Sequence, residues 1–208
     1  NKKIKNYQKK NKKKISLKKK LKEILDEKNQ VIKSLGKNYK YNFDKKKILQ
    51  YKKFKNLRLI GMGGSILGSQ AIYDFLIHKI KKKFYFISNL NSTSQKKKEN
   101  NFLNLIVSKS GNTIETISNA NIYKKNKDKN IFITENKKNY LYELAKKLKS
   151  EIVHHNNYIG GRYSVLSEVG MLPAELMGLN SSKFRQFNSL IKNTSNLNLA
   201  FLYKNSIT

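Results

Sequence analysis

A short polar loop, residues 108–113, carries the residue types that hold an anion. Its sequence is Ser-Lys-Ser-Gly-Asn-Thr, which supplies hydroxyl donors, one ammonium group and one glycine at which the backbone can turn. The loop follows the apolar run 102–107 and opens a helical pattern over 113–123, so the unpaired N–H groups of a helix N-terminus lie beside it. These residue types favour a phosphate-binding loop. A plain strand-to-helix turn, in which Ser, Asn and Thr compete as the N-cap, has the same composition.

A glycine-rich turn over 61–68 is the second group of residues that could bind a ligand. It is not a dinucleotide-binding fingerprint, because Ile66 stands where that motif needs its third glycine. It is not a Walker A loop either, because the lysine and hydroxyl residue of that motif do not follow. The turn can bring backbone N–H groups and the Ser65 hydroxyl close to a ligand. Tight packing of a helix on a sheet, with Ser65 as the N-cap, is the alternative interpretation.

The third motif, Gly-Gly-Arg-Tyr-Ser at 160–164, places an arginine after two glycines. A guanidinium keeps its proton and can stabilise an oxygen atom that gains negative charge during a reaction. A surface ion pair is the alternative role for Arg162. Two histidines, His154 and His155, precede this motif, and we expect them to be solvated or structural imidazoles.

Short apolar runs alternate with helical patterns from residue 57 onward. The predicted strands are 57–60, 84–87, 102–107, 131–134 and 151–153. The predicted helices are 65–80, 113–123, 140–148, 164–179 and 184–191, with a short polar helix or loop at 94–101. This alternation predicts an α/β fold, an open parallel sheet of about five strands with helices on both faces. Each motif follows a predicted strand, so we expect the motifs to meet at the carboxyl ends of the strands, where such sheets bind ligands.

Two local predictions concern the helices beside the motifs. In the helix predicted over 65–80, we expect one apolar face, formed by Ile66, Leu67, Ile72, Phe75, Leu76 and Ile80. In the helix after the polar loop, Glu115 would repel a phosphate. We therefore expect Glu115 to point away from the loop and to form a capping box with Asn112.

The chain begins with a basic stretch that we predict to be largely helical. Apolar residues spaced along one helical face run from Ile15 to Leu35, and Gly36 is the expected C-cap. A connector with a short helix at 45–51 leads to the first strand. We therefore predict three parts, a basic helical N-terminal extension over 1–54, the α/β domain over 55–180 and the start of a further helical segment over 181–208.

The composition is strongly basic and free of cysteine. Lys and Arg number 45 against 13 Asp and Glu, a net charge of +32, which would ordinarily indicate a nucleic-acid or membrane partner. Nearly all of these cations are lysines spread along the whole chain, and the favoured residue types share A/T-rich codons. We therefore attribute the charge to solvated faces, with a nucleic-acid-binding protein as the alternative.

The absence of cysteine excludes disulfides and thiolate chemistry. No apolar run is long enough to cross a bilayer or to serve as a secretory signal, so we expect a cytoplasmic protein without a membrane partner.

Together, the three motifs resemble the successive signatures of the glucose-6-phosphate isomerase family, in the family's order and over residues 57–179. The matching segments are Gly-Met-Gly-Gly-Ser at 61–65, Ser-Lys-Ser-Gly-Asn-Thr-Ile-Glu-Thr at 108–116 and Gly-Gly-Arg-Tyr-Ser at 160–164. The resemblance implies a sugar isomerase (SIS) domain that interconverts glucose 6-phosphate and fructose 6-phosphate through a cis-enediol. It also implies that no metal or nucleotide cofactor takes part, that a sugar phosphate is the partner and that the full-length protein is a homodimer.

The resemblance also implies roles for single residues. The phosphate ligands would be Ser108, Lys109, Ser110 and Thr113. Ser65 would lie at the sugar, and Gly161 and Arg162 would line the reacting carbons, with the Arg162 side chain as the catalytic group that stabilises the enediolate. The expected substrate-binding set is Gly64, Ser65, Ser108, Lys109, Ser110, Gly111, Asn112, Thr113, Gly161 and Arg162.

The chain departs from the family pattern in two respects. Its loop, with Ser-Gly-Asn at 110–112, is closer to SIS domains in general and to bifunctional phosphoglucose/phosphomannose isomerases than to the usual threonine-rich loop. The family's base glutamate, ring-opening histidine and late lysine have no counterpart here, and neither Glu168 nor Glu175 matches that glutamate. We therefore expect the N-terminal part of an isomerase, which binds a sugar phosphate but does not isomerise it alone. The alternatives are a non-enzymatic SIS module that senses a sugar phosphate and a bifunctional phosphoglucose/phosphomannose isomerase.

Overall fold

The computed structural model describes residues 19–20, 22–23, 29–90, 101–125 and 127–185. The chain divides into two units, one made of Asn1–Tyr39 with Ser182–Thr208 and the other of Lys40–Ser181. The connector that precedes the first strand thus belongs to the larger unit. The predicted element at 94–101, most of the predicted N-terminal helix and the segment after residue 185 lie outside the described residues.

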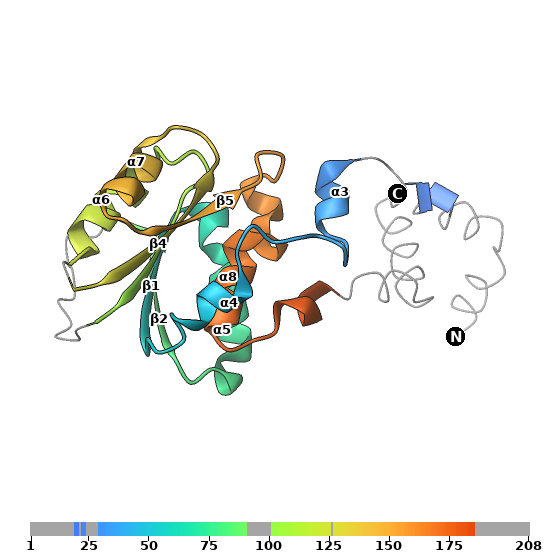
Figure 1. The fold of residues 1–208 in the computed structure, drawn as a ribbon. Coiled ribbons are helices and arrows are strands. Elements are labelled where there is room, and N and C mark those ends of the chain that lie inside the picture. The colour runs from blue at the N-terminus through green and yellow to red at the C-terminus, as the bar shows by residue number, and fades with distance from the viewer. Residues whose placement is uncertain (1–18, 21, 24–28, 91–100, 126, 186–208) are drawn as a thin grey trace. The chain divides into compact units, whose positions relative to one another are not determined.

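A parallel five-stranded sheet forms the centre of the larger unit, in the order β2-β1-β3-β4-β5 (Figure 1). The strands are β1 (Asn56–Gly61), β2 (Lys83–Ile87), β3 (Leu103–Val107), β4 (Lys129–Glu135) and β5 (Glu151–His155). Every residue of β3 is buried, as expected for the central strand of a sheet that is covered on both faces. The prediction of an α/β fold with an open parallel sheet is confirmed.

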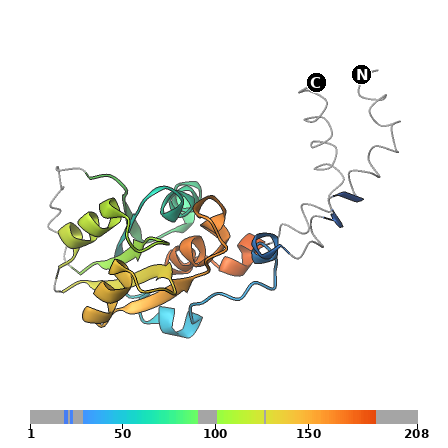
Figure 2. The same ribbon diagram turned by 90° about the horizontal axis from the view of Figure 1, so that it is seen from above.

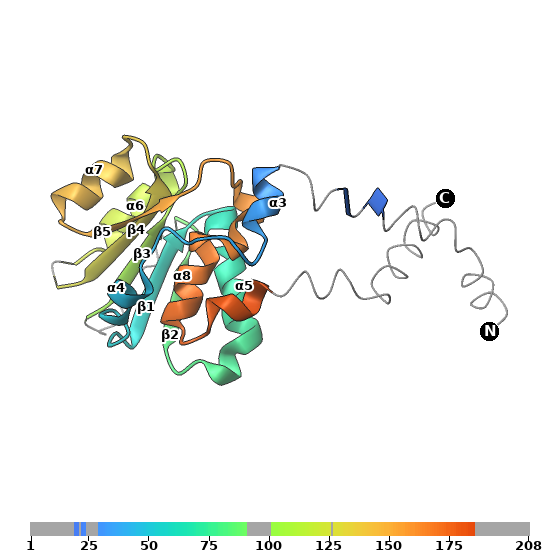
Figure 3. The ribbon, with the colours of Figure 1, turned by 45° about the vertical axis from the view of Figure 1, so that its right-hand side comes forward.

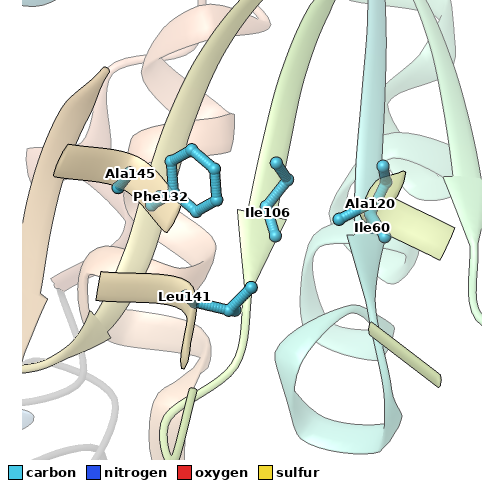
Figure 4. Packing of buried hydrophobic residues seen from close by; sticks show 6 residues of the cluster. All are labelled: Ile60, Ile106, Ala120, Phe132, Leu141 and Ala145. Atoms are coloured by element: carbon cyan, nitrogen blue, oxygen red, sulfur yellow. The ribbon is translucent and has the colours of Figure 1, made fainter. Parts of the chain in front are cut away.

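Helices cover both faces of this sheet, as predicted. α6 (Ile114–Tyr123) and α7 (Tyr140–Lys147) lie on one face, and α5 (Leu67–Leu76) and α8 (Glu168–Leu176) lie on the other (Figures 2 and 3). Alternate residues of a strand point to the same face, so one buried position from each of the three central strands meets α6 and α7. The resulting cluster consists of Ile60, Ile106, Phe132, Ala120, Leu141 and Ala145 (Figure 4).

The connections that follow β1 and β3 run over opposite faces of the sheet. β1 continues into α5 and returns as β2, whereas β3 continues into α6 and returns as β4. Because β1 and β3 are neighbours, the chain leaves their carboxyl ends in opposite directions and a crevice opens between the two loops. The glycine turn and the polar loop follow these two strands, so the topology alone brings them together.

The helix predicted over 65–80 is divided in the structure. A 3₁₀ turn, η1 (Gly63–Ser65), precedes α5, and a second one, η2 (Ile77–Lys79), follows it. The predicted apolar face is wrong at two positions, because Leu67 and Phe75 are 60% and 81% exposed. Ile66, just before α5, is buried as expected.

α5 approaches its neighbours through small residues, which explains why two of its bulky side chains stay outside. Ser69 is buried, and its Oγ donates to the carbonyl oxygen of Val169 in α8 at 3.1 Å. A Cβ on Gly68 would lie only 2.7 Å from Val165 Cγ2. The close contact therefore falls on the small face of the helix, and hydrophobic periodicity alone does not identify that face.

The remaining elements differ from the prediction mainly at their ends. The short helix expected at 45–51 is α4 (Lys45–Leu49), and the helix expected at 164–179 consists of a 3₁₀ segment, η3 (Gly161–Leu166), followed by α8. In the smaller unit, α3 (Gln30–Ser34) has Leu35 as its C-cap, one residue before the predicted position. A further 3₁₀ segment, η4 (Ser181–Arg185), begins where the larger unit ends. Over the described ranges, no helix is both long enough and apolar enough to cross a membrane.

Candidate functional site

A pocket of about 270 Å³ opens at the carboxyl ends of β1, β3 and β4. Its lining residues are Met62, Ser65, Ser108, Lys109, Ser110, Thr113, Thr116 and Glu135. The glycine turn and the polar loop therefore meet in one site, where the connections of the sheet diverge. Half of the expected substrate-binding residues line it, namely Ser65, Ser108, Lys109, Ser110 and Thr113. The others, Gly64, Gly111, Asn112, Gly161 and Arg162, do not.

Ser108 closes the polar loop at its base. The residue is 2% exposed, and its N–H donates to the carbonyl oxygen of Ile133 at 3.1 Å, which extends the ladder between β3 and β4. Its Oγ lies 2.9 Å from Thr113 Oγ1 and accepts a hydrogen bond from Gly111 N at 3.2 Å. These bonds join the first and last residues of the loop and so fix its curvature around the pocket.

Gly111 and Asn112 hold the loop against α7. Gly111 has a φ of +68°, and a Cβ at this position would lie 1.8 Å from Asn139 Oδ1, so only glycine fits. The Gly111 carbonyl accepts from Leu141 N at 3.1 Å, and Asn112 Oδ1 accepts from Tyr140 N at 3.0 Å. The loop thus caps the first turn of α7, and these two residues support the pocket from behind.

Within the described part of the chain, no side chain caps the start of α6. Its N-cap residue is Thr113, whose carbonyl accepts from Ile117 N at 3.0 Å while its hydroxyl faces Ser108. The predicted capping box between Asn112 and Glu115 is wrong, because the Asn112 side chain is used by α7. The first N–H groups of α6 therefore remain available at the pocket, as an anion site requires.

Lys109 links the pocket to the loop that follows β5. Its Nζ donates to the carbonyl oxygen of Asn157 at 2.5 Å. An ammonium group has three N–H donors, so two remain for a ligand. Arg162 lies in η3 with an exposed side chain, and no residue in the described part of the chain forms an ion pair with it.

The two glycine turns touch each other beside the pocket. A Cβ on Gly64 would lie 2.3 Å from the carbonyl oxygen of Gly161, so the two backbones could not approach so closely with larger residues. Ser164 Oγ lies 2.6 Å from the Gly161 carbonyl oxygen and 3.1 Å from that of Gly64. One buried hydroxyl therefore joins the turn that carries Arg162 to the wall that carries Ser65.

Three pocket residues are absent from the sequence-based set, namely Met62, Thr116 and Glu135. Thr116 is 1% exposed, and its Oγ1 has no hydrogen-bond partner within the described ranges. The usable signal was its spacing, since Thr116 follows Thr113 by three residues and so lies on the same helical face. Glu135 ends β4, one residue beyond the predicted strand, and its N–H donates to the Lys109 carbonyl at 3.0 Å.

Two of the other ionisable candidates, His155 and Glu175, contact other protein groups, whereas His154 Nδ1 is buried with no hydrogen-bond partner among the described residues. His155 is buried, with Nε2 at 3.1 Å from the Ile159 carbonyl oxygen and Nδ1 at 3.6 Å from Glu168 Oε2, which confirms a structural role. Glu175 accepts from Ser181 and forms an ion pair with Lys45 at 2.9 Å. Among the residues that the structure describes, no three His, Asp or Glu side chains are grouped so that they could hold a metal ion.

Comparisons with known proteins agree on a family. The family model described as "Phosphoglucose isomerase" matches residues 1–205. The chain is 38% identical over 157 residues to the glucose-6-phosphate isomerase of Methanocaldococcus jannaschii, which covers 70% of this chain and 38% of that protein. It is 36% identical over 158 residues to the glucose-6-phosphate isomerase of Borreliella afzelii, covering 64% of this chain and 29% of that protein. The chain thus spans well under half the length of these curated relatives.

Solved structures support the fold. A hypothetical protein from Thermus thermophilus superposes with a TM-score of 0.68 at 19% identity, over 96% of this chain and 54% of that chain. Tagatose-6-phosphate ketose/aldose isomerase from Escherichia coli superposes with a TM-score of 0.51 at 18% identity, over 68% of this chain and 43% of that chain. The family resemblance carried by the three motifs is confirmed by the family model and the curated relatives. The chain belongs to the phosphoglucose isomerase family.

Proposed function

We propose that this chain is the sugar-phosphate-binding part of a glucose-6-phosphate isomerase, whose whole protein interconverts glucose 6-phosphate and fructose 6-phosphate. One observation carries the proposal. Hydroxyl groups, an ammonium group and the N-terminus of α6 surround one pocket, and a buried hydroxyl there, Thr116 Oγ1, has no partner in the described protein. A phosphate offers several acceptor oxygens to such a set of donors.

The roles divide between the two ends of the ligand. The phosphate would accept hydrogen bonds from the polar loop and from Thr116, and the sugar would lie toward Gly64 and Ser65. The phosphate ligands in this assignment are Ser108, Lys109, Ser110, Thr113 and Thr116. Gly111 and Asn112 would act indirectly, because their contacts with α7 hold the loop in place.

Arg162 would act on the reaction itself. Isomerisation moves a proton from one carbon to its neighbour through a base, and the enediolate formed in between carries negative charge on oxygen. A permanently charged guanidinium next to that oxygen lowers the barrier. The exposed Arg162 side chain lies on a turn that is joined to the pocket wall through Ser164, and this arrangement supports the role.

We infer that the 208 residues bind the sugar phosphate without isomerising it. Glu168 is completely buried against His155, and Glu175 is held by Ser181 and Lys45, so neither carboxylate is available as a base. Glu135 lines the pocket, but its backbone bond to Lys109 places it beside the phosphate loop. The carbon atoms that exchange the proton lie at the opposite end of the sugar from the phosphate.

Calorimetric titration of the chain with glucose 6-phosphate tests the binding proposal. Replacement Lys109→Ala removes a charged donor, so we expect the affinity to fall roughly 10- to 100-fold. Ser108→Ala should weaken binding in the same direction. Lys147→Ala, which removes one charge from the exposed surface of α7, is the matched control and should leave the affinity unchanged.

Two results would contradict this assignment. One is an unchanged affinity in both the Lys109 and the Ser108 variants. The other is equal binding of glucose and glucose 6-phosphate by the unaltered chain, because the site would then not recognise the phosphate. A coupled assay with fructose 6-phosphate tests the inference about turnover, and a normal rate from the chain alone would overturn it.

A further inference from the structure

A buried ionisable pair lies outside the pocket and outside the roles assigned so far. His155 is the last residue of β5, and Glu168 is the first residue of α8. Their side chains are 2% and 0% exposed, and His155 Nδ1 lies 3.6 Å from Glu168 Oε2. Removing two ionisable groups from water is costly even when they are paired, so the contacts of this pair call for an explanation.

One hydrogen bond and one close contact with a carboxylate define the orientation of the imidazole. The carbonyl oxygen of Ile159, 3.1 Å from His155 Nε2, can only accept, so Nε2 carries a hydrogen and donates it. Nδ1 lies 3.6 Å from Glu168 Oε2 and forms no hydrogen bond with any described residue. The other carboxylate oxygen accepts from Asn42 N at 3.0 Å, so the connector before α4 holds Glu168 in place. A continuous chain of contacts thus runs from Asn42 through Glu168 and His155 to the Ile159 carbonyl.

Ile159 lies in the middle of the loop that leads to Arg162. On one side, the Asn157 carbonyl is held by Lys109 from the pocket wall. On the other side, Gly161 packs on the backbone of Gly64. Between these two points, His155 at the end of β5 contacts the loop at the Ile159 carbonyl oxygen. His155 does not line the pocket.

We propose that His155, oriented by Glu168, is a positioning residue for the sugar end of the site. The inference rests on the proposed function, in which Gly161 and Arg162 face the sugar and the polar loop faces the phosphate. Loss of the His155 donor releases the Ile159 carbonyl and shifts the turn that carries Arg162. Binding of a whole sugar phosphate then weakens, whereas binding of inorganic phosphate alone does not change.

The test compares two ligands, glucose 6-phosphate and inorganic phosphate, in titrations of the full 208-residue chain. His155→Leu removes the donor and keeps an apolar side chain in the buried site. We expect its affinity for glucose 6-phosphate to fall about fivefold, the equivalent of one lost hydrogen bond, with an unchanged affinity for phosphate. His155→Gln can still donate from its amide nitrogen and should recover most of the loss. His154→Leu, at the neighbouring half-buried histidine, is the matched control and should bind both ligands normally.

A ligand-independent measurement keeps the inference separate from the proposed function. In ¹H–¹⁵N spectra, the amide signals of Gly160 and Gly161 should move in His155→Leu and stay near their original positions in His155→Gln. Glu168→Leu tests the orienting partner, because leucine can make neither the contact with His155 nor the bond from Asn42 N, and it should shift the same signals in the direction of His155→Leu. If the unaltered chain binds no sugar phosphate, the proposed function fails. The spectral comparison would still test whether His155 positions the turn that carries Arg162.

Three outcomes would overturn the positioning role. One is a folded His155→Leu protein with unchanged glycine signals. The second is a loss of affinity that is equal for phosphate and for glucose 6-phosphate, because the residue would then support the whole site. The third is a His155→Gln protein that behaves like His155→Leu, because the donated hydrogen bond would then not be the cause. If His155→Leu does not fold, the ratio of the affinities for phosphate and for glucose 6-phosphate, measured with Glu168→Leu, decides the question.

Discussion

The sheet carries a polar cluster at each end, and the two clusters differ in how completely they are satisfied. At the amino ends of the strands, Arg58, Asn104, Asp128 and Asn130 are all buried. Arg58 Nη1 donates to Asp128 Oδ2 at 3.0 Å, Asn104 Nδ2 donates to Asn130 Oδ1 at 2.9 Å, and Phe102 N donates to Asp128 Oδ1 at 3.1 Å. The guanidinium also stacks on the Phe102 ring, with 3.4 Å from Cζ to the centroid.

At the carboxyl ends, the polar groups are only partly paired with one another. Ser108 and Thr113 bond to each other, but the buried Thr116 hydroxyl has no partner within the described residues and α6 lacks a side-chain cap. In a buried cluster whose donors and acceptors are paired with one another, no hydrogen-bonding group is left for a ligand. Unpaired donors around a pocket can instead be satisfied by a ligand. The Arg58 cluster and the pocket thus differ in unmet hydrogen-bonding capacity, which the described residues also show outside the pocket at Lys82 Nζ, His154 Nδ1 and His155 Nδ1.

Removal of Arg58 from the buried cluster at the amino ends of the strands should lower the free energy of unfolding more than any other change proposed here. Arg58→Leu leaves the carboxylate of Asp128 buried without its partner, so we expect a loss of about 3–5 kcal/mol in the free energy of unfolding. Urea denaturation measures it. In the double variant Arg58→Leu/Asp128→Asn the stranded charge is gone and an acceptor for Phe102 N remains, so part of the loss should be recovered. A loss below about 1 kcal/mol in the single variant would show that the cluster is not a structural unit.

The arrangement of the satisfied cluster could be anticipated only in part. The apolar runs around Leu59, Leu105 and Ile131 predicted the strands, because a parallel sheet covered on both faces needs continuous hydrophobic segments. Register was not predictable from these runs. Arg58 faces Asn104, and Asn104 faces Asn130, because of pairing between strands that are distant in sequence.

The residues that line the pocket were predictable where the signal is local. The hydroxyls and lysine of the polar loop, together with Ser65, could be named from residue type and from their place after a strand. The role of Asn112 could not, because it depends on α7 docking behind the loop. The spacing of Thr116 from Thr113 could have placed it on the pocket side of the helix, but only the packed structure shows that its hydroxyl is buried with no partner among the described residues.

A second prediction separates loop geometry from backbone strain. Gly111 and Gly178 both have a positive φ, +68° and +90°, but only at Gly111 would a Cβ strike another residue, Asn139. We expect Gly178→Ala to cost about 1 kcal/mol of stability through strain alone. Gly111→Ala adds the clash and should cost about 2–4 kcal/mol and weaken binding of glucose 6-phosphate. Equal losses in the two variants, measured by denaturation, would mean that the contact with Asn139 is easily relieved.

The buried Thr116 hydroxyl, which has no partner among the described residues, gives the sharpest test of the difference between the two ends of the sheet, although its removal should change stability little. Thr116→Val removes a buried hydroxyl that has no partner in the described structure, so the ligand-free protein should keep or gain stability, by about 1 kcal/mol at most. Its affinity for glucose 6-phosphate should nevertheless fall about fivefold. Thr113→Val, the matched control, loses the bond to Ser108 and should be destabilised by about 1 kcal/mol. A Thr116→Val protein that is less stable and binds normally would remove the distinction between the two ends.

The contribution of Glu175 to stability should depend on pH and not on ligand, because this largely buried carboxylate, with 13% of its side chain exposed, lies outside the pocket. Burial raises the pKa of Glu175, but hydrogen bonds from Ser181 and the Lys45 ammonium outweigh it and hold the pKa below the ordinary value of 4.5. The ionised form is favoured by folding, so its contribution is complete above pH 4.5 and is lost as the pH falls through the lowered pKa. Glu175→Gln should therefore flatten the decline of stability in this acid range, whereas Glu143→Gln on the exposed side of α7 should not. Phosphate-saturated and ligand-free protein should show the same change, because Glu175 is paired with protein groups and not with the pocket. If ligand altered the effect of Glu175→Gln on stability, the pairing of Glu175 with Ser181 and Lys45 would be coupled to binding at the pocket. Hydrogen-bonded groups outside the pocket could then not be treated as independent of it.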